Sequence, residues 1–267
     1  MRSQQFHRPF SDAARRRKAP VNKLLATLPA DDFERISALL TLVPMTFKQI
    51  VYEQDEPIEY VFFPGGGTCS LTKVMQDGKI AEIATIGNEG VLGASVFFGD
   101  DHSFGQTLVQ VAESDAFRMP VELFMTEMAR RGAFYNCVIR YSQALMSQVM
   151  QITVCNGLHS LEQRCCRWLL MTDDRVESDG MRLTHEFMSN MLGVRRTSVT
   201  LIMGELQKAR LVETRRGMIY IADRAGLEAT SCECYATVKA TFARLLPETA
   251  SKSTAIQATT GLRQSGS

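Results

Sequence analysis

The stretch LTHEFMSNMLGVRRTSVTLIMGELQKARLV, residues 183–212, has the clearest structural pattern in this chain. Thr184 is a residue type that caps helix N-termini, and Gly193 stands where a tight turn between two helices needs a left-handed backbone. On both sides of this turn apolar residues recur at helical spacing, which predicts two short helices packed on the rest of a domain. Their apolar faces consist of Phe187, Met188, Met191 and Leu192, then Val199, Ile202, Met203 and Leu206.

The opposite face of the second predicted helix is suited to reading DNA. Its start carries arginines and short polar residues, and the planar arginine fork can bond guanine O6 and N7 together. Residues 212–214 and 218–221 predict two short strands, and the basic tip between them is suited to contacting backbone phosphates. The candidate DNA-binding residues are Thr184, His185, Arg195, Arg196, Thr197, Ser198, Thr200, Arg215 and Arg216.

The local charge favours the same interpretation. The whole chain has a net charge of only +1, but residues 182–216 hold seven Lys or Arg against three acidic residues. Taken alone, such a helical pair could be an ordinary hairpin with solvated arginines. The basic strand pair that follows favours a winged helix-turn-helix that binds nucleic acid.

Composition limits the other classes of protein. An apolar fraction of 45% is enough for a packed core. Seven cysteines at irregular spacing do not resemble a secreted disulfide framework, and no apolar run approaches the roughly 18 residues that span a bilayer. We therefore expect a cytoplasmic protein with no membrane segment. An organellar transit peptide is the alternative interpretation of its Arg-rich start.

Outward from the motif, the chain divides into five predicted segments. Residues 1–20 are expected to be a basic flexible arm, and a helix is expected over Leu24–Leu40 within a β-rich effector domain, residues 21–132. Residues 158–230 are the winged helix-turn-helix domain, and residues 231–267 an extra helix with a disordered tail. The predicted strands are Ile50–Tyr52, Tyr60–Phe63, Cys69–Val74, Ile80–Ile86, Thr107–Val111 and Ala116–Met119.

Residues 133–157 predict a long helix between the two domains. It has one charged residue, Arg140, and its apolar residues alternate steps of four and three, a heptad-like pattern. Such a helix needs cover on two sides, so we expect it to pack on its own β domain and against a second copy of the chain. Asn156-Gly157 is expected to end it. The predicted dimer seam includes Phe134, Val138, Tyr141, Leu145 and Ile152.

With these motifs the chain resembles the CRP/FNR superfamily of transcription regulators over about residues 24–227. Residues 183–212 follow that family's helix-turn-helix without a gap, and the segments VFFPGGGTCSLTKV, DGKIAEIATIGNEGVLG and VQVAESDAFRMP resemble its cyclic-nucleotide-binding β-roll. The resemblance implies an α+β fold with an N-terminal β-roll of the double-stranded β-helix or jelly-roll type, a long dimerisation helix and a C-terminal winged helix-turn-helix. It also implies that Arg196 and Thr197 contact bases. Leu201 replaces a base-reading arginine, so the operator should differ.

The effector site departs from the family pattern. Members that bind cyclic AMP carry an acidic residue after a Phe-Gly pair and an Arg-Ser or Arg-Thr pair that holds the phosphate. Here Leu92-Gly93-Ala94 and Gly105-Gln106 take these places. Since a buried phosphate without a cation is poorly compensated, we predict that cyclic AMP is not the effector. The glycine-rich turn is either a cradle for another ligand or a structural turn. The candidate pocket residues are Gly87, Glu89, Gly90, Gly93, Gln106 and Thr107.

No metal, cofactor or catalytic set is predicted. Neither Cys165-Cys166 nor Cys232-Glu233-Cys234 has the spacing of a CxxC site, so buried free thiols are expected, with metal or redox sensing as the alternative. The first cysteine is Cys69, so the N-terminal cluster of the oxygen-responsive relatives is not expected.

The expected function is that of a bacterial homodimeric regulator that reads a palindromic operator, not an enzyme. Its expected partners are double-stranded DNA, a second copy of the chain and RNA polymerase, with an unidentified small-molecule effector as a further candidate. The alternative is an effector-binding or scaffold protein whose winged helix contacts other proteins. The four arginines of the motif disfavour that alternative.

Overall fold

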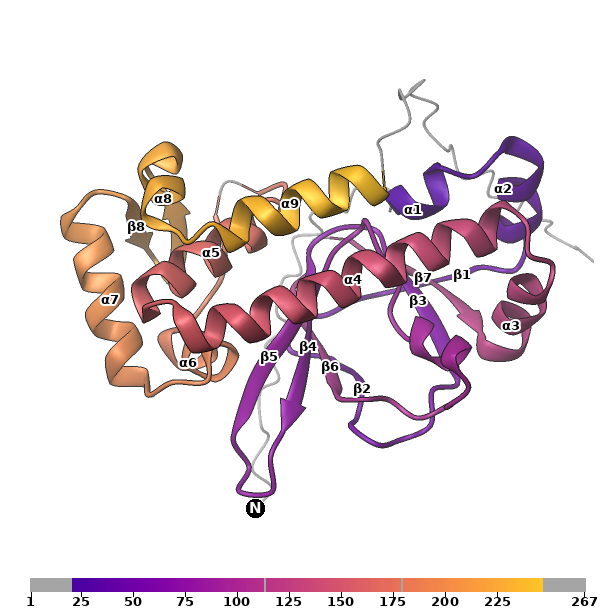
Figure 1. Cartoon of the computed structure of the whole chain (residues 1–267), viewed down its shortest axis with the longest axis horizontal. Helices are drawn as coiled ribbons and strands as arrows, with labels where there is room; N and C mark the ends of the chain where they lie inside the picture. Colours follow the sequence, from indigo (N-terminus) through magenta and orange to yellow (C-terminus); the bar gives the residue numbers. More distant parts are fainter. Residues whose placement is uncertain (1–20, 113, 179, 247–267) are drawn as a thin grey trace, which may run out of the picture.

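A computed structural model describes residues 21–112, 114–178 and 180–246 of the chain. These residues form a β-roll, a long helix beside it, and a helical C-terminal half at the far end of that helix (Figure 1). The predicted basic arm and the end of the predicted tail, residues 1–20 and 247–267, lie outside the described residues. No helix in the described part of the chain has the length and apolar character needed to cross a bilayer.

The β-roll consists of two antiparallel sheets, with strand orders β1-β7-β3 and β2-β6-β4-β5. The six strands predicted from the sequence are confirmed to within one residue at each end, and Gly78 adopts the left-handed conformation expected of the Asp77-Gly78 turn between β4 and β5. A seventh strand, β1, was not predicted. The strands are β1 (Thr41–Val43), β2 (Ile50–Tyr52), β3 (Tyr60–Pro64), β4 (Thr68–Val74), β5 (Ile80–Ile86), β6 (Gln106–Val111) and β7 (Ala116–Pro120).

The prediction of a single helix over Leu24–Leu40 is wrong. The structure has two short helices instead, α1 (Lys23–Ala26) and α2 (Ala30–Ser37). Pro29 separates them, because proline disfavours helical backbone in the preceding residue and has no N–H to continue a helix. The apolar periodicity persisted across the break since apolar residues of both helices belong to the same buried cluster.

Asn22 fixes α1 to the β-roll. Its side-chain oxygen accepts a hydrogen bond from Leu25 N at 3.0 Å, which caps the helix. Its amide nitrogen donates to the carbonyl oxygens of Pro64 at 3.0 Å and Gly90 at 2.9 Å. All the hydrogen-bonding groups of this buried amide are therefore used in holding the segment in place.

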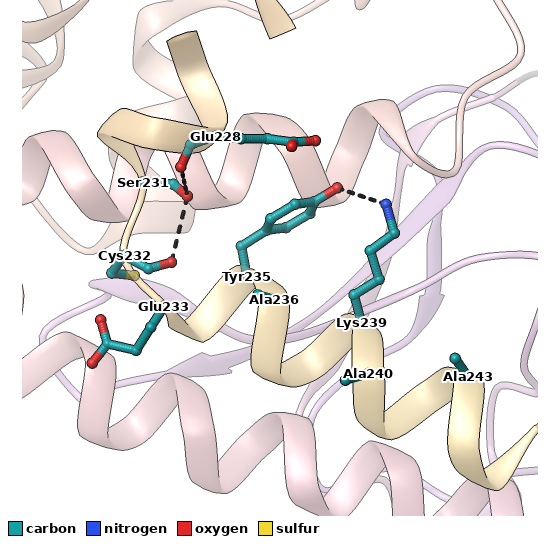
Figure 2. Close-up of a pocket in the computed structure, with 9 residues that line it drawn as sticks. All are labelled: Glu228, Ser231, Cys232, Glu233, Tyr235, Ala236, Lys239, Ala240 and Ala243. Atoms are coloured by element: carbon teal, nitrogen blue, oxygen red, sulfur yellow. Dashed lines mark hydrogen bonds between the residues drawn. The ribbon is translucent and has the colours of Figure 1, made fainter. Parts of the chain in front are cut away.

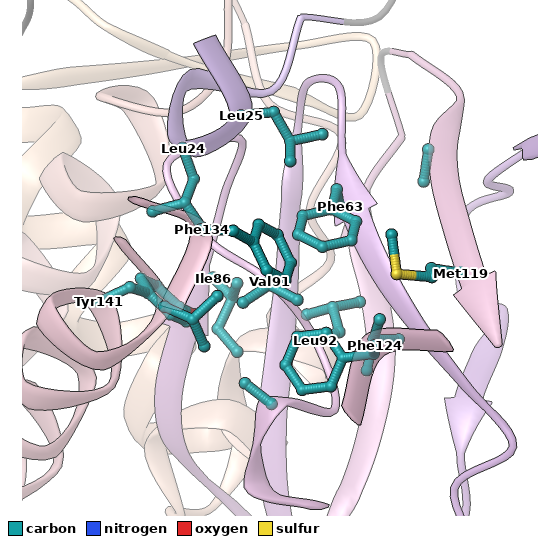
Figure 3. Close-up of a cluster of buried hydrophobic side chains, with 14 of the residues drawn as sticks. Leu24, Leu25, Phe63, Ile86, Val91, Leu92, Met119, Phe124, Phe134 and Tyr141 are labelled. Atoms are coloured by element: carbon teal, nitrogen blue, oxygen red, sulfur yellow. The ribbon is translucent and has the colours of Figure 1, made fainter. Parts of the chain in front are cut away.

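The core of the β-roll lies between its sheets and the two helices that follow them, α3 (Val121–Ala129) and α4 (Ala133–Leu158). Figure 3 shows aromatic rings from β3, α3 and α4 meeting in this core. The ring of Phe134 packs on Phe124 and Phe63, with centroids 5.8 and 6.2 Å apart. Such tilted and edge-to-face contacts are favourable for aromatic pairs, so they fix the start of α4 on the roll.

Helix α4 passes through the predicted break at Asn156-Gly157 and ends at Leu158. The break lies slightly later because Ser160 and Gln163 form a capping box that starts α5 (Leu161–Asp173). The domain boundary predicted near Gly157 thus lies inside a continuous helix, and the chain turns at His159.

The residues predicted for a dimer seam pack inside the chain. Four of them are at most 4% exposed, and the fifth, Leu145, is partly buried. All but Ile152 pack in or against the core of the β-roll, and all five have little surface left for a second copy. The five are Phe134, Val138, Tyr141, Leu145 and Ile152. The exposed apolar side chains of α4 are instead Met146, Met150, Val154 and Leu158.

The described C-terminal half contains the two motif helices, the strand pair and three further helices, α5, α8 and α9. Helix α9 lies within residues 231–267, where an extra helix was predicted, and it runs back along α4 towards the β-roll (Figure 1). Helix α8 and the 3₁₀ helix η1 were not predicted. The bounds are η1 (Ala94–Phe98), α6 (His185–Leu192), α7 (Arg196–Lys208), β8 (Val212–Arg215), β9 (Met218–Ile221), α8 (Arg224–Thr230) and α9 (Cys234–Leu245).

Candidate nucleic-acid interface

The turn between α6 and α7 is fixed by local hydrogen bonds. Thr184 Oγ1 accepts from Phe187 N at 3.1 Å and caps α6, as predicted. Gly193 ends the helix at φ 65° and ψ 38°, the left-handed conformation predicted for it. Arg164 of α5 donates to the carbonyl oxygen of Leu192 at 2.6 Å and so satisfies the C-terminal end of α6. These contacts set the angle at which α7 leaves the turn.

Helix α7 presents a basic N-terminus to the outside of the molecule (Figure 1). One face is anchored, since Val199, Met203 and Leu206 are at most 1% exposed. Arg195 and Arg196 are exposed and form no ion pair with any residue that the structure describes. Their charges add to the positive end of the helix dipole, so this end of α7 is suited to a phosphate-rich surface.

The strand pair β8–β9 is a tight hairpin beside α7. Arg216 and Gly217 have φ values of 52° and 76°, so the two central residues of the turn are left-handed, as in the commonest two-residue hairpins. Arg215 pairs with Glu213 and lies 5.9 Å from the centroid of the Tyr220 ring. The hairpin therefore holds two arginines at its tip, one partly neutralised by a neighbouring acid.

Gln207 joins the hairpin to α7, a role that the sequence did not indicate. Its amide nitrogen donates to Thr214 Oγ1 at 2.7 Å. Because both residues are exposed, no hydrophobic pattern marked them. The bond links the C-terminal part of α7 to the hairpin, so helix and hairpin form one unit.

Two of the predicted DNA-binding residues contact each other. His185 Nδ1 lies 3.0 Å from Thr200 Oγ1, which links the start of α6 to α7. Thr197 is exposed beside them, while Ser198 is partly buried. The arginines, Thr197 and Thr200 thus share one end of α7, and His185 is placed to orient Thr200.

The C-terminal half packs directly on the four-stranded sheet. Trp168 of α5 donates its indole N–H to Glu82 of β5 at 2.9 Å. Gln110 of β6 accepts from Ser70 Oγ at 2.8 Å and donates to Thr172 Oγ1 at 2.9 Å. Burial raises the pKa of Glu82 to about 7, although the hydrogen bond from Trp168, the nearby Ser70 hydroxyl and the charges of Arg167 and Arg175 act in the opposite direction.

A groove of about 250 Å³ lies between this sheet and α6. Thr184 lines it, so this predicted DNA-binding residue faces the β-roll in the described arrangement. Phe47 and Phe187 add a ring contact between the two halves, with centroids 6.2 Å apart. The groove is lined by Lys48, Ile50, Ile80, Gln106, Leu108, Thr184, Glu186, Phe187, Asn190 and Met191.

Side chains of the protein fill the space beside the glycine-rich turn of the predicted effector pocket. A Cβ atom on Gly90 would lie 2.4 Å from the Tyr141 ring, and one on Gly93 would lie 2.5 Å from the Tyr52 hydroxyl. Beside Gly87, a carboxylate oxygen of Glu89 forms an ion pair with Arg175 Nε at 2.8 Å.

The two strand residues predicted for that pocket face elsewhere. Gln106 donates to Glu53 at 2.9 Å and lines the groove below α6. Thr107 is buried in the sheet, where it pairs with Tyr52 and Leu71. The six predicted pocket residues therefore lie in several different environments.

Comparison with protein families matches both halves of the chain. Residues 163–230 match a model of the Crp-like helix-turn-helix domain, and residues 46–131 match a model of the cyclic nucleotide-binding domain. The chain is 21% identical over 196 residues to the global nitrogen regulator of Synechococcus elongatus, a match that covers 66% of this chain and 87% of the relative.

Solved structures share the same arrangement of elements. A transcriptional regulator of the Crp/Fnr family from Eubacterium rectale matches with a TM-score of 0.61 at 21% identity, over 78% of this chain and 96% of that one. FixK2 from Bradyrhizobium japonicum matches with a TM-score of 0.62 at 16% identity, over 72% of this chain and 98% of that one. At these identities the likeness establishes the fold alone.

Proposed function

Because the chain belongs to the CRP/FNR superfamily of transcription regulators, we propose that it binds a palindromic DNA operator as a homodimer. One observation carries the proposal: α7 has exposed arginines at its start, and a hydrogen bond joins the C-terminal part of the same helix to the β8–β9 hairpin, which carries two further arginines. Two such units related by a two-fold axis would read two half-sites about one helical turn apart. RNA polymerase is the proposed partner at promoters, and the cytoplasm the proposed location.

Within each unit, Arg196 and Thr197 are the proposed base-reading residues. Both are exposed on the first turn of α7, which in helix-turn-helix proteins enters the major groove. Leu201, one turn later, is 65% exposed, and its side chain is suited to contact a thymine methyl group rather than a guanine. Arg215 and Arg216 are proposed to contact phosphates.

The proposed dimer contact is the exposed apolar stripe of α4. Met146, Met150, Val154 and Leu158 follow one another at intervals of four residues and are 51–76% exposed. Residues at this spacing lie on one helical face. Four large apolar side chains in one exposed stripe are typical of a surface that a second protein covers. A second copy presents the same stripe, so the contact would be self-complementary.

We also propose that cyclic AMP does not control this regulator. The side chains of Tyr141 and Arg175 occupy the space beside the glycine-rich turn, and Ala94 has no carboxylate for a ribose hydroxyl. Arg175 is the cation nearest to this turn, but it is paired with Glu89 at 2.8 Å. A nucleotide would have to break this ion pair and displace both side chains.

Selection from random duplex DNA tests the proposal. Wild-type protein without added ligand should enrich a palindrome, and Arg196→Ala should lose enrichment at one position of each half-site. Arg244→Ala, which removes a cation from exposed α9 far from the motif, is the matched control and should enrich the wild-type sequence. Absence of binding at low salt would overturn the proposal and favour a winged helix that contacts proteins.

A further inference from the structure

Four potential metal ligands meet where α4 ends and α9 begins. Cys155 lies in the last turn of α4, and His159 follows the end of that helix. Cys232 lies in the connection between α8 and α9, and Cys234 is the first residue of α9. One donor atom from each lies within 4.8 Å of all the others. Cys155 Sγ is 3.5 Å from Cys232 Sγ, and Cys234 Sγ is 3.5 Å from His159 Nδ1. The sequence separation of 77 residues between Cys155 and Cys232 concealed this cluster.

We propose that these four side chains bind one Zn²⁺ ion in a tetrahedral Cys₃His site. Zinc takes thiolate sulfur at about 2.3 Å and imidazole nitrogen at about 2.0–2.1 Å, which places tetrahedral ligands about 3.7 Å from one another. The separations in the cluster are already near that value, so binding needs only small side-chain adjustments. Soft sulfur ligands with one imidazole also disfavour Mg²⁺ and Ca²⁺, which prefer oxygen.

A second layer of contacts orients these ligands. Nε2 of His159 lies 3.2 Å from a carboxylate oxygen of Glu233, so this nitrogen is suited to donate its proton and leave Nδ1 free for a metal. A histidine held between a carboxylate and a zinc ion is a recurrent arrangement in zinc proteins. The amide nitrogen of Gln151 lies 3.0 Å from Cys234 Sγ and can stabilise a thiolate there.

Charge around the cluster matches a zinc thiolate centre. Three thiolates, a neutral imidazole and Zn²⁺ have a net charge of −1, which needs a nearby cation. Arg167 is 3% exposed, and its Nε has no hydrogen-bond partner in the described part of the chain.

Metal can reach the cluster from a surface groove along α9. His159 has 15% of its side chain exposed, and Cys232 and Glu233 line one end of a groove of about 510 Å³. Figure 2 shows both residues at the start of α9, with Ser231 beside them. Ser231 Oγ donates to the carbonyl oxygen of Glu228 at 2.8 Å, so the backbone that carries Cys232 and Cys234 is fixed before metal binds.

A zinc ion here would join α9 to the junction between α4 and the C-terminal half. If the proposed function holds, this junction sets how the two helix-turn-helix units are held apart. The zinc site itself does not depend on that function, and metal content can be measured without DNA. Binding releases the thiol protons, so loading should fall as the pH is lowered.

Metal analysis of the full-length protein tests the site. Protein purified without chelator should contain one Zn²⁺ per chain, as measured by inductively coupled plasma mass spectrometry. After chelation, Co²⁺ should restore one equivalent and give the visible bands of tetrahedral cobalt with thiolate charge transfer in the near ultraviolet. Cys232→Ser and His159→Gln should lose most of the bound metal. Cys137→Ser, a thiol outside the cluster, should retain it.

Two results would overturn the proposal. One is stoichiometric metal binding that persists in the Cys232→Ser variant and also in the Cys155→Ser variant. The other is a wild-type protein that binds neither Zn²⁺ nor Co²⁺. This result would overturn the proposal both if the cysteines are free and if peptide mapping shows a Cys155–Cys232 disulfide. The cobalt spectrum of the wild-type protein keeps the test valid if a variant fails to fold.

Discussion

Glu82 is an acidic side chain buried between the two halves of the molecule, where it is only 6% exposed. It stands on β5 with one carboxylate oxygen bonded to the Trp168 indole, while the other has no partner in the described residues. Burial raises its pKa from the ordinary 4.5 to about 7. Between these values the folded protein retains a proton that the unfolded chain has released, so stability is lost as the pH rises through this window.

The Glu82→Gln variant should remove this pH dependence. The amide can still accept from Trp168 but does not ionise, so the variant should exceed the wild type in stability at pH 7 by up to about 3 kcal/mol. At pH 4.5 the two should be nearly equal. Urea unfolding across this window measures the effect, with Glu34→Gln, an exposed acid, as control. A variant with the same pH slope as the wild type would contradict the pKa assigned to Glu82.

Arg215 should act on all DNA sequences alike. Its place at the hairpin tip suits phosphate contact, so Arg215→Ala should reduce the slope of log affinity against log salt by about 0.9. Arg196→Ala should instead cost about 1–3 kcal/mol at the selected operator and much less on random DNA. Fluorescence titrations at several salt concentrations separate the two effects. An unchanged slope of log affinity against log salt in Arg215→Ala would show that Arg215 does not contact DNA phosphates.

At the scale of single elements, the helix-turn-helix could be read from the sequence because its signals are local. Thr184 caps a helix within three residues of its own position, and Gly193 needs only its own backbone to make the turn. The tertiary contacts of each element could not be predicted in this way. The periodicity of α4 predicted a helix but not which face the β-roll covers, so the seam was placed on residues such as Tyr141 that the chain itself buries. The metal cluster was missed for the same reason, since its thiols meet only in the folded chain.

Met150 tests which face of α4 meets a second copy. The Met150→Glu variant places a charge in the exposed stripe, and burial of that charge on association should weaken the dimer by at least tenfold. Analytical ultracentrifugation over a range of concentrations measures the change. Met75→Glu is a matched control, since Met75 is 59% and Met150 58% exposed, and Met75 lies on the β4–β5 hairpin instead. Equal dimerisation of the two variants would exclude the stripe as the dimer contact.

At the scale of the whole molecule, the hydrophobic core of the C-terminal half extends into the β-roll. Leu108 and Val111 of β6 belong to the same buried cluster as Trp168, Met188 and Leu192. The ion pair between Arg175 and Glu89 and the hydrogen bonds of Gln110 cross the same boundary. A shift of the helix-turn-helix relative to the β-roll would therefore expose apolar surface and break buried polar contacts, so the described arrangement should resist rearrangement without a ligand or partner.

Because the core of the C-terminal half includes residues of the β-roll, the two halves should unfold together. Trp168 is the single tryptophan of the chain and lies at the boundary, so its fluorescence reports on that contact. Its unfolding curve in urea should coincide with the loss of helical circular dichroism at the same protein concentration. Gln110→Ala leaves buried Ser70 and Thr172 hydroxyls without their partner and should shift both curves together by about 1–3 kcal/mol. Gln143→Ala, on the exposed face of α4, should shift neither. Separate transitions in the wild type would show that the halves fold independently and that the contact through Trp168 adds little to stability.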